Sequence, residues 1–266
     1  MIPLLIVFIF CVGACLGSFF NALVSRFGSE KNWSPLSRSR CDVCDHRLGV
    51  LDLIPILSFL TFCRGRCRFC GRPIPAYYPV IELLTGLLCV GLVLSVLQPL
   101  HFPPLIDPNS VVSVSLLYSF VMIFFLATLF DYQYQAIPKS LIMTILVLGL
   151  VSIADPTATE FWIIRVIGGV VGFLLMTSQY LITRGKGLGS GDIFLTLSIG
   201  FFLGWKLLLV AIFFTYALGS LFGLFLVLNK KASGKRKIPL APFLFTGLLI
   251  SLVFGSDIAR WYLSLL

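Results

Sequence analysis

The chain has 266 residues, of which 58% are hydrophobic and only 12% are charged, with a formal net charge of +9. Soluble domains are nearer half apolar and a quarter charged, so this composition excludes an ordinary soluble domain and predicts an all-α polytopic membrane protein. The positive charge is therefore read as a sign of membrane topology, and we expect no nucleic-acid partner.

Apolar runs near the length of a bilayer crossing recur along the chain and predict about eight transmembrane helices. The first run lacks a basic stretch before it and continues into "GSFFNALVSR" instead of a small-residue cleavage site. We therefore expect a retained helix and not a signal peptide. The expected spans are roughly 2–24, 78–98, 111–130, 140–154, 161–183, 192–204, 207–229 and 239–256.

Basic residues are unevenly distributed between these spans. Seventeen of the 20 Lys and Arg residues lie in segments 24–77, 131–140, 184–191 and 230–237. With eight spans and an outside N-terminus, all four segments fall on one side of the membrane. Basic loops stay in the cytoplasm, so both termini are expected to be periplasmic. Membrane lipids are the expected surroundings of the spans.

Three parts are expected along the chain. Residues 1–24 form the first transmembrane helix, residues 25–77 form a cytoplasmic segment with four paired cysteines, and residues 78–266 form the remaining transmembrane domain. A cytoplasmic segment of this size can bury little apolar core, so a bound metal would supply folding free energy to it.

Two Cys-x-x-Cys pairs supply the ligands for such a metal. Cys41 and Cys44 form the first pair, and Cys67 and Cys70 form the second. In a reducing compartment this pattern predicts one tetrahedral zinc ion held by four thiolates, a closed and therefore structural site. Cys63 is a nearby alternative ligand. Four free thiols or a redox pair are the competing interpretations.

Two aspartates lie where apolar runs begin or end on the cytoplasmic side. Asp131 follows "SFVMIFFLATLF", and Asp192 precedes "IFLTLSIGFFLG". An ionisable side chain at a membrane boundary is unfavourable unless it is paired or functional. A helix-start carboxylate facing the headgroups is the simpler alternative. Two neighbouring aspartates, however, share a proton, so that one acts as general base on water and the other as general acid.

The glycine run before Asp192, "GKGLGSGD", favours a functional site. Gly187, Gly189 and Gly191 would let another backbone, such as a substrate strand, approach Asp192 closely. A phosphate-binding loop would need a Lys followed by Ser or Thr after the glycines, and a strand before them. Here Lys186 precedes these glycines and an apolar span precedes the loop, so the phosphate-loop alternative fits less well.

Together these motifs resemble the bacterial type IV prepilin peptidase family, the bifunctional prepilin leader peptidases and N-methyltransferases. The resemblance covers nearly the whole chain and rests on "GSFFNALVSR", the two cysteine pairs, "DLIPILSFL", "YYPVIELLTGLL", "DYQYQAIP", "GLGSGD" and "KIPLAPFL". It implies that Asp131 and Asp192 are the catalytic pair of a Gly-x-Gly-Asp intramembrane aspartyl protease. It also implies that 78–266 is the peptidase domain and that 25–77 is the suspected methyltransferase region.

The resemblance further implies a two-step reaction. The enzyme would cut the leader from a type IV pilin or type II secretion pseudopilin precursor at the cytoplasmic face of the bacterial inner membrane. It would then methylate the new N-terminal residue with S-adenosylmethionine. No donor-binding residue can be assigned from the sequence. Glu82 and Asn21 are candidates, although a helix-boundary carboxylate and a backbone-satisfying amide explain them equally well.

Three positions depart from the family pattern, and one other class of function stays open. Gly28, Lys139 and Phe194 replace the residues usual at those positions, which bears on substrate range more than on activity. The alternative is a proton-coupled transporter or a zinc-stabilised assembly factor in which the aspartates form a proton relay. A transporter usually has paired repeats and broken midplane helices, and the sequence shows no convincing repeat.

Overall fold

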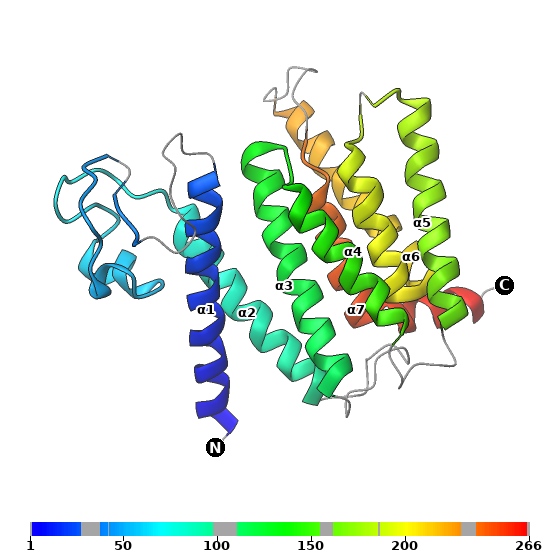
Figure 1. The fold of residues 1–266 in the computed structure, drawn as a ribbon, viewed down its shortest axis with the longest axis horizontal. Coiled ribbons are helices and arrows are strands. Elements are labelled where there is room, and N and C mark those ends of the chain that lie inside the picture. The colour runs from blue at the N-terminus through cyan, green and yellow to red at the C-terminus, as the bar shows by residue number, and fades with distance from the viewer. Residues whose placement is uncertain are drawn as a thin grey trace. The chain divides into compact units, whose positions relative to one another are not determined.

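The computed structural model describes residues 2–27, 38–41, 43–97, 111–154, 162–185, 187–229 and 238–264. Within these ranges the chain is helical, with two isolated β-bridges and no strand (Figure 1). It forms two compact units, Met1–Leu94 and Ser95–Leu266. The all-α fold of a membrane protein is confirmed, whereas the three-part functional division expected from the sequence stays a prediction.

In the first unit, α1 (Ile2–Phe27) packs closely against α2 (Tyr77–Leu97). Small residues on α1 make this possible. A Cβ at Gly17 would lie 2.9 Å from the Cα of Glu82, and a Cβ at Gly13 would lie 2.8 Å from the carbonyl oxygen of Thr85. Close backbone approach of this kind is how apolar helices associate in lipid, where neighbouring helices gain no hydrophobic burial. The contact brings α1 directly against Glu82.

Between α1 and α2, residues 38–41 and 43–76 make short turns instead of long helices. Two of them are helical turns, η1 (Val50–Asp52) and η2 (Ser58–Phe62). Two others are closed by β-bridges, Arg40 with Arg47 and Arg66 with Pro73. This segment carries all four cysteines of the two Cys-x-x-Cys pairs.

The described part of the second unit contains five helices. They are α3 (Val111–Tyr134), α4 (Lys139–Ile153), α5 (Trp162–Ile182), α6 (Ser190–Leu228) and α7 (Ala241–Ser264). The most buried of them is α3, on which Phe120 and Phe124 are fully buried. Phe120 stacks on Phe202 of α6 with ring centroids 4.4 Å apart, and Phe124 packs beside Phe245 of α7. The core of this unit therefore surrounds α3.

One glycine divides α6 into two halves. Gly204 has a non-helical backbone with φ +73° and ψ 168°, in the left-handed half of the map that glycine enters readily. The half before it packs on α5, where a Cβ at Gly168 would lie 2.5 Å from the carbonyl oxygen of Gly200. The half after it packs antiparallel to α7, since Ser251 donates to the carbonyl of Leu207 and Thr215 donates to the carbonyl of Phe243.

Because α6 folds back on itself at Gly204, several chain connections lie at one end of this unit. In Figure 1 the α3–α4 connection, the start of α6 and the end of α6 lie at the same end. A straight helix of 39 residues would hold its ends about 58 Å apart. Folding back at Gly204 instead brings both ends of α6 to the level of the last turn of α3.

The helices agree closely with the spans expected from the sequence, except in their number. Among the described residues, six helices are long and apolar enough to cross a membrane, and α4 is a shorter apolar helix of 15 residues. The expected break between spans 192–204 and 207–229 coincides with Gly204. The count of eight spans and the orientation of the termini stay predictions.

Candidate active site and candidate metal centre

Asp131 lies in the last turn of α3 and contacts the start of α7. Its Oδ2 accepts a hydrogen bond of 3.0 Å from the backbone N–H of Ala241, the first residue of α7. Soon after Asp131, Gln135 takes a positive φ of 53° and ends the helix. A carboxylate at a helix N-terminus is stabilised by the partial positive charge there. The carboxylate of Asp131 is therefore held where α3 meets α7.

Asp192 occupies the third position of α6 and is buried, with 9% of its surface exposed. Its Oδ2 accepts a 3.0 Å hydrogen bond from the N–H of Gly189, which precedes the helix. This contact satisfies one of the amide groups left open at a helix start. The sequence-level alternative of a helix-start carboxylate thus describes the local geometry of Asp192 correctly, but it leaves the burial unexplained.

The structure gives different reasons for the three glycines expected to support Asp192. A Cβ at Gly189 would lie 3.2 Å from Asp192 Oδ2, and a Cβ at Gly191 would lie 3.2 Å from Ile142 of α4. Side chains at these two positions would crowd the carboxylate and the α4 contact. A Cβ at Gly187 would meet Thr183 at 3.8 Å, an ordinary contact. Gly185, with φ +69°, is the member of the run that needs glycine for its backbone conformation.

The two aspartates come from different helices and lie within electrostatic range of each other. One carboxylate is bonded to the start of α7 and the other to the start of α6. Two carboxyl groups that interact electrostatically are stabilised by sharing a proton, which gives one the character of a base and the other that of an acid. The arrangement suits acid–base hydrolysis, and the catalytic role of the pair stays a prediction.

Tyr216 is a neighbour of this site that sequence reasoning missed. It lies on the second half of α6, donates a hydrogen bond to Gln179 Oε1 of α5, and is within electrostatic range of Asp192. Its hydroxyl also lies 3.7 Å from the sulfur of Met176. The signal was a tyrosine in the apolar run "FFTYALG", but its position beside Asp192 depends on the reversal at Gly204.

In the first unit the four paired cysteines come together. The sulfur atoms of Cys41, Cys44, Cys67 and Cys70 all lie within 4.8 Å of one another. The Sγ atoms of Cys41 and Cys70 are 3.9 Å apart. Four sulfurs around a tetrahedral zinc with Zn–S bonds of about 2.3 Å are separated by about 3.8 Å. The cluster therefore has the composition and size of a four-thiolate zinc site, and it can hold a metal ion.

The two pairs sit on equivalent turns. The N–H of Cys41 bonds to the carbonyl of His46 at 3.0 Å, and the N–H of Cys67 bonds to the carbonyl of Arg72 at 2.8 Å. In the second turn, the backbone N–H groups of Cys70 and Phe69 point at the Cys67 sulfur and lower its pKa to about 7. Backbone donors of this kind stabilise the thiolate form, which is the form that binds metal.

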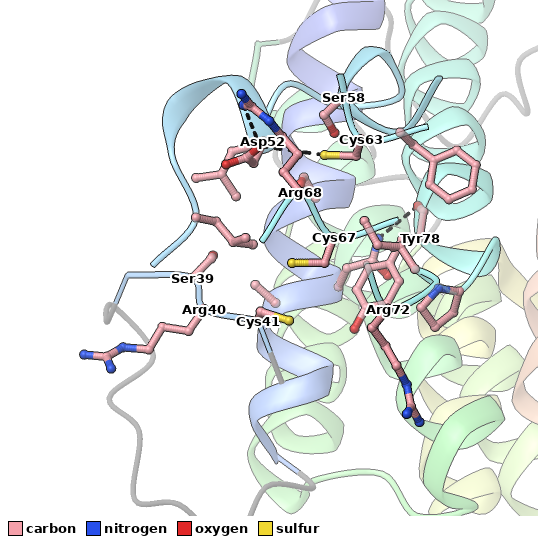
Figure 2. Close-up of a pocket in the computed structure, with 18 of the residues that line it drawn as sticks. Ser39, Arg40, Cys41, Asp52, Ser58, Cys63, Cys67, Arg68, Arg72 and Tyr78 are labelled. Carbon is pink, nitrogen blue, oxygen red and sulfur yellow. Dashed lines mark hydrogen bonds and ion pairs between the residues drawn. The ribbon is translucent and has the colours of Figure 1, made fainter. Parts of the chain in front are cut away.

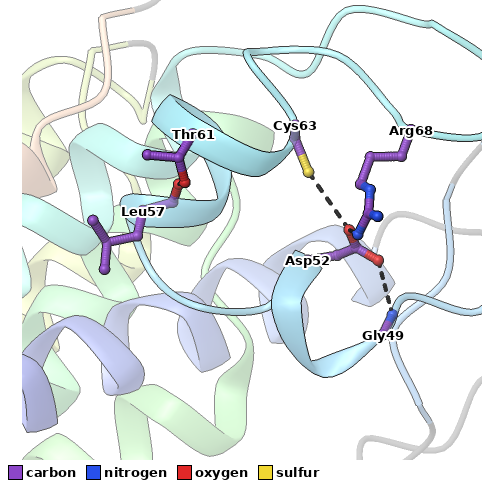
Figure 3. Close-up of polar contacts among 6 residues, drawn as sticks. All are labelled: Gly49, Asp52, Leu57, Thr61, Cys63 and Arg68. Carbon is purple, nitrogen blue, oxygen red and sulfur yellow. Dashed lines mark hydrogen bonds and ion pairs between the residues drawn. The ribbon is translucent and has the colours of Figure 1, made fainter.

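Cys63, the alternative ligand, lies outside the cluster. Its sulfur is 3.7 Å from Asp52 Oδ1. Figure 3 shows the thiol pointing toward this carboxylate. Burial, followed by the nearby charge of Asp52, raises the pKa of the Cys63 thiol. The same carboxylate accepts from Arg68 at 3.2 Å and from the N–H of Gly49 at 3.0 Å. Cys63 thus belongs to a polar network centred on Asp52.

The two candidate donor-site residues, Asn21 and Glu82, are both buried in the first unit. The Nδ2 of Asn21 donates to the carbonyl of Tyr78 at 3.1 Å, and Oε2 of Glu82 accepts from the N–H of Ile56 at 2.7 Å. Of the three departures from the family pattern, Lys139 is the exposed first residue of α4 and Phe194 is exposed on α6. Gly28 lies outside the described residues.

Each of the two units contains a segment that matches a known protein family. Residues 11–96 match the bacterial peptidase A24 N-terminal domain, and residues 117–224 match the type IV leader peptidase family. No solved structure matches the chain.

Similar relatives carry the name prepilin leader peptidase/N-methyltransferase. One from Aeromonas hydrophila is 30% identical over 96% of this chain and 93% of the relative, and one from Bacillus subtilis (strain 168) is 31% identical over 97% of both. A third, from Pseudomonas aeruginosa, is 27% identical over 96% of this chain and 93% of its own length. The chain therefore belongs to the type IV leader peptidase family, among the prepilin leader peptidases/N-methyltransferases.

Proposed function

We propose that this protein removes the leader peptide of type IV prepilins or type II secretion pseudopilins and then N-methylates the new N-terminal residue. The observation that carries the proposal is the match to relatives named for both activities along nearly their whole length. The aspartate pair in the second unit, of which Asp192 is buried, supports it, because the pair supplies an acid and a base without further groups. The transporter and assembly-factor alternatives are not favoured by these matches.

In the proposed peptidase step, Asp131 and Asp192 act as a pair. One carboxylate takes a proton from water while the water oxygen bonds to the scissile carbonyl carbon. The other, protonated, carboxyl group gives its proton to the peptide nitrogen, and the carbon–nitrogen bond breaks. Hydrogen bonds from Ala241 and Gly189 hold the two carboxylates in place during these transfers. Such positioning is a large part of enzymatic rate acceleration.

We propose that the four-cysteine cluster holds one structural zinc ion. Four thiolates fill a tetrahedral shell, so no ligand position is left for water or substrate. The ion would hold the turns at Cys41 and Cys67 together and stabilise the segment between α1 and α2. The methyl donor is proposed to be S-adenosylmethionine, which supplies an electrophilic methyl group, and pilin or pseudopilin precursors are the proposed protein partners.

The protein is a multi-pass membrane protein. We propose the bacterial inner membrane as its location, with membrane lipids around the helices, the aspartate pair at the cytoplasmic side and both termini in the periplasm. Two basic residues support this orientation, Lys139 at the start of α4 and Arg184 just before α6. They adjoin the same two connections as Asp131 in the last turn of α3 and Asp192 at the start of α6.

The proposed function is tested with detergent-solubilised protein and a pilin precursor. Mass spectrometry should show loss of the leader and, with S-adenosylmethionine present, a gain of one methyl group on the product. An intact precursor after prolonged incubation with folded protein would argue against the peptidase assignment. Cleavage without methylation would leave a peptidase alone.

A further inference from the structure

The first unit contains a cavity that adjoins the cysteine cluster at Cys41 and Cys67 and extends from there to α1 and α2. Its volume is about 220 Å³, and its lining comes from α1, from α2 and from the segment between them (Figure 2). Asn21 reaches it from α1, Tyr78 and Glu82 from α2, and Asp52 and Arg68 from the intervening segment. Three stretches far apart in the sequence thus enclose one space lined by charged, amide and aromatic side chains.

Glu82 is the most unusual group in this lining. It is 9% exposed, accepts hydrogen bonds from the N–H of Ile56 and the hydroxyl of Ser18, and forms no ion pair with any residue that the structure describes. Burying a carboxylate without a cation is strongly unfavourable. A carboxylate kept in this state beside a cavity is well suited to receive a positive charge from a ligand.

The backbone around Glu82 is held in an unfavourable conformation. Ile56, whose N–H bonds to Glu82 at 2.7 Å, has a φ of +61°. A β-branched residue rarely adopts a positive φ, and conformations of this kind gather at ligand-binding and catalytic sites. On the opposite side of Glu82, the Gly17 contact lets α1 approach its Cα. The carboxylate is therefore held by the Ile56 N–H, and the turn of α2 that carries Glu82 packs against α1.

Asp52, the other carboxylate that lines the cavity, differs from Glu82 because it already has a cationic partner. Asp52 is bonded to Arg68, Cys63 and the N–H of Gly49, so its charge is already compensated within the protein (Figure 3). The other charged residues of the lining are Arg40 and Arg72, Cys41 and Cys67 belong to the cysteine cluster, and Phe69 and Tyr78 offer aromatic rings. The cavity thus combines one unpaired carboxylate with a group for an anion and with rings for a flat heterocycle.

These features match the parts of S-adenosylmethionine. The molecule carries a positively charged sulfonium and an ammonium, a carboxylate and an adenine ring. A cavity of 220 Å³ is below the usual range of about 300–1,000 Å³ for sites that enclose a drug-sized ligand, so it suits one end of the molecule better than the whole. The sulfonium end is the part that an unpaired carboxylate would attract.

We propose that this cavity binds the sulfonium and amino-acid end of S-adenosylmethionine, with Glu82 facing the positive charge. The inference rests on the proposed methyltransferase function. In the transfer, the lone pair of the neutral pilin amine bonds to the methyl carbon. The carbon–sulfur bond breaks with its electron pair left on sulfur, and the methylated ammonium gives a proton to water. Since the product S-adenosylhomocysteine has a neutral sulfur, Glu82 should favour the donor over this product.

Binding measurements on the full-length protein in detergent test the proposal without reference to turnover. Glu82→Gln should weaken binding of S-adenosylmethionine, and of sinefungin, which has a protonated amine in place of the sulfonium, by at least tenfold. Binding of S-adenosylhomocysteine should change less than threefold. Asp257→Asn, an exposed carboxylate of the second unit paired with Arg260, is the matched control and should change none of the three. Retained prepilin cleavage would show that each variant is folded.

The outcomes separate the inference from the function on which it rests. If the wild-type protein neither binds the donor nor methylates a cleaved pilin, the methyltransferase function fails. A second outcome is that the wild-type protein both binds the donor and methylates the pilin. In that case, the contact between Glu82 and the sulfonium is refuted if Glu82→Gln binds all three ligands with wild-type affinity, or if its affinity for all three falls equally. If the variant does not fold, labelled donor is cross-linked to the wild-type protein with ultraviolet light, and the labelled peptides show where the donor binds. Label is expected in peptides from 38–82, and label confined to Ser95–Leu266 would overturn the proposal.

Discussion

Loss of one thiolate from the cysteine cluster should release its metal. The perturbation is Cys67→Ser, which removes the ligand that two backbone amides hold as a thiolate. Structural zinc sites contribute roughly 10–16 kcal/mol of binding free energy, so one of four ligands accounts for about 3–4 kcal/mol. At about 1.4 kcal/mol for each tenfold change, the zinc affinity should fall by two to three powers of ten.

The assay is the zinc content of purified protein after dialysis against a chelator of graded concentration. Wild-type protein should retain one zinc per chain at chelator concentrations that empty Cys67→Ser. Cys63→Ser is the matched control, because its sulfur contacts Asp52 and lies outside the cluster, and it should keep its zinc. The emptied variant should also be cut faster by protease between α1 and α2. Equal zinc retention by Cys67→Ser and wild type would refute the reasoning, as would wild-type protein that contains no zinc.

Two further predictions concern the second unit. Gly204→Ala should lower the thermal unfolding midpoint, because a positive φ costs an L-residue about 1–2 kcal/mol and the new Cβ would lie 2.8 Å from Ile164. Gly91→Ala is the control and should not lower the midpoint, because a Cβ at Gly91 would meet nothing within 4 Å. Equal midpoints for the two variants would contradict the fold-back of α6 at Gly204. Tyr216→Phe should lower kcat for prepilin cleavage about three- to tenfold with KM unchanged, since a hydrogen bond is worth about 1 kcal/mol. The exposed Tyr262→Phe serves as its control, and an unchanged kcat for Tyr216→Phe would remove Tyr216 from the site.

Much of the fold could be read from periodicity and length, because lipid-exposed helices must satisfy their own backbone hydrogen bonds and show as long apolar runs. The charge pattern predicts separate spans at 192–204 and 207–229, because with one span fewer the basic segment "KKASGKRK" would lie on the periplasmic side of the membrane. The structure has its break at Gly204. What the sequence could not supply is how the two halves of α6 pack, because glycine contacts such as that of Gly168 with Gly200 depend on the helix partners.

The candidate sites were predictable to different degrees. The two Cys-x-x-Cys pairs have the spacing of metal ligands, so a four-sulfur cluster could be predicted from the sequence alone. The proximity of Asp131 and Asp192 was inferred from equal depth, but the contacts with Ala241 and Gly189 depend on where α6 and α7 start. Glu82 could be singled out only weakly, because its lack of an ion pair with any described residue and its contact with the strained Ile56 are properties of the folded segment.

Cleavage of a pilin precursor by single aspartate variants tests the central claim most directly. Asp131→Asn and Asp192→Asn should each leave the precursor mass unchanged, because neither carboxylate can serve as both acid and base. Asp131→Asn should still transfer label from S-adenosylmethionine to a pre-cleaved pilin peptide, which would show that the protein is folded and that the two activities are separable. Cleavage by either variant at the wild-type rate would contradict the assignment of the pair.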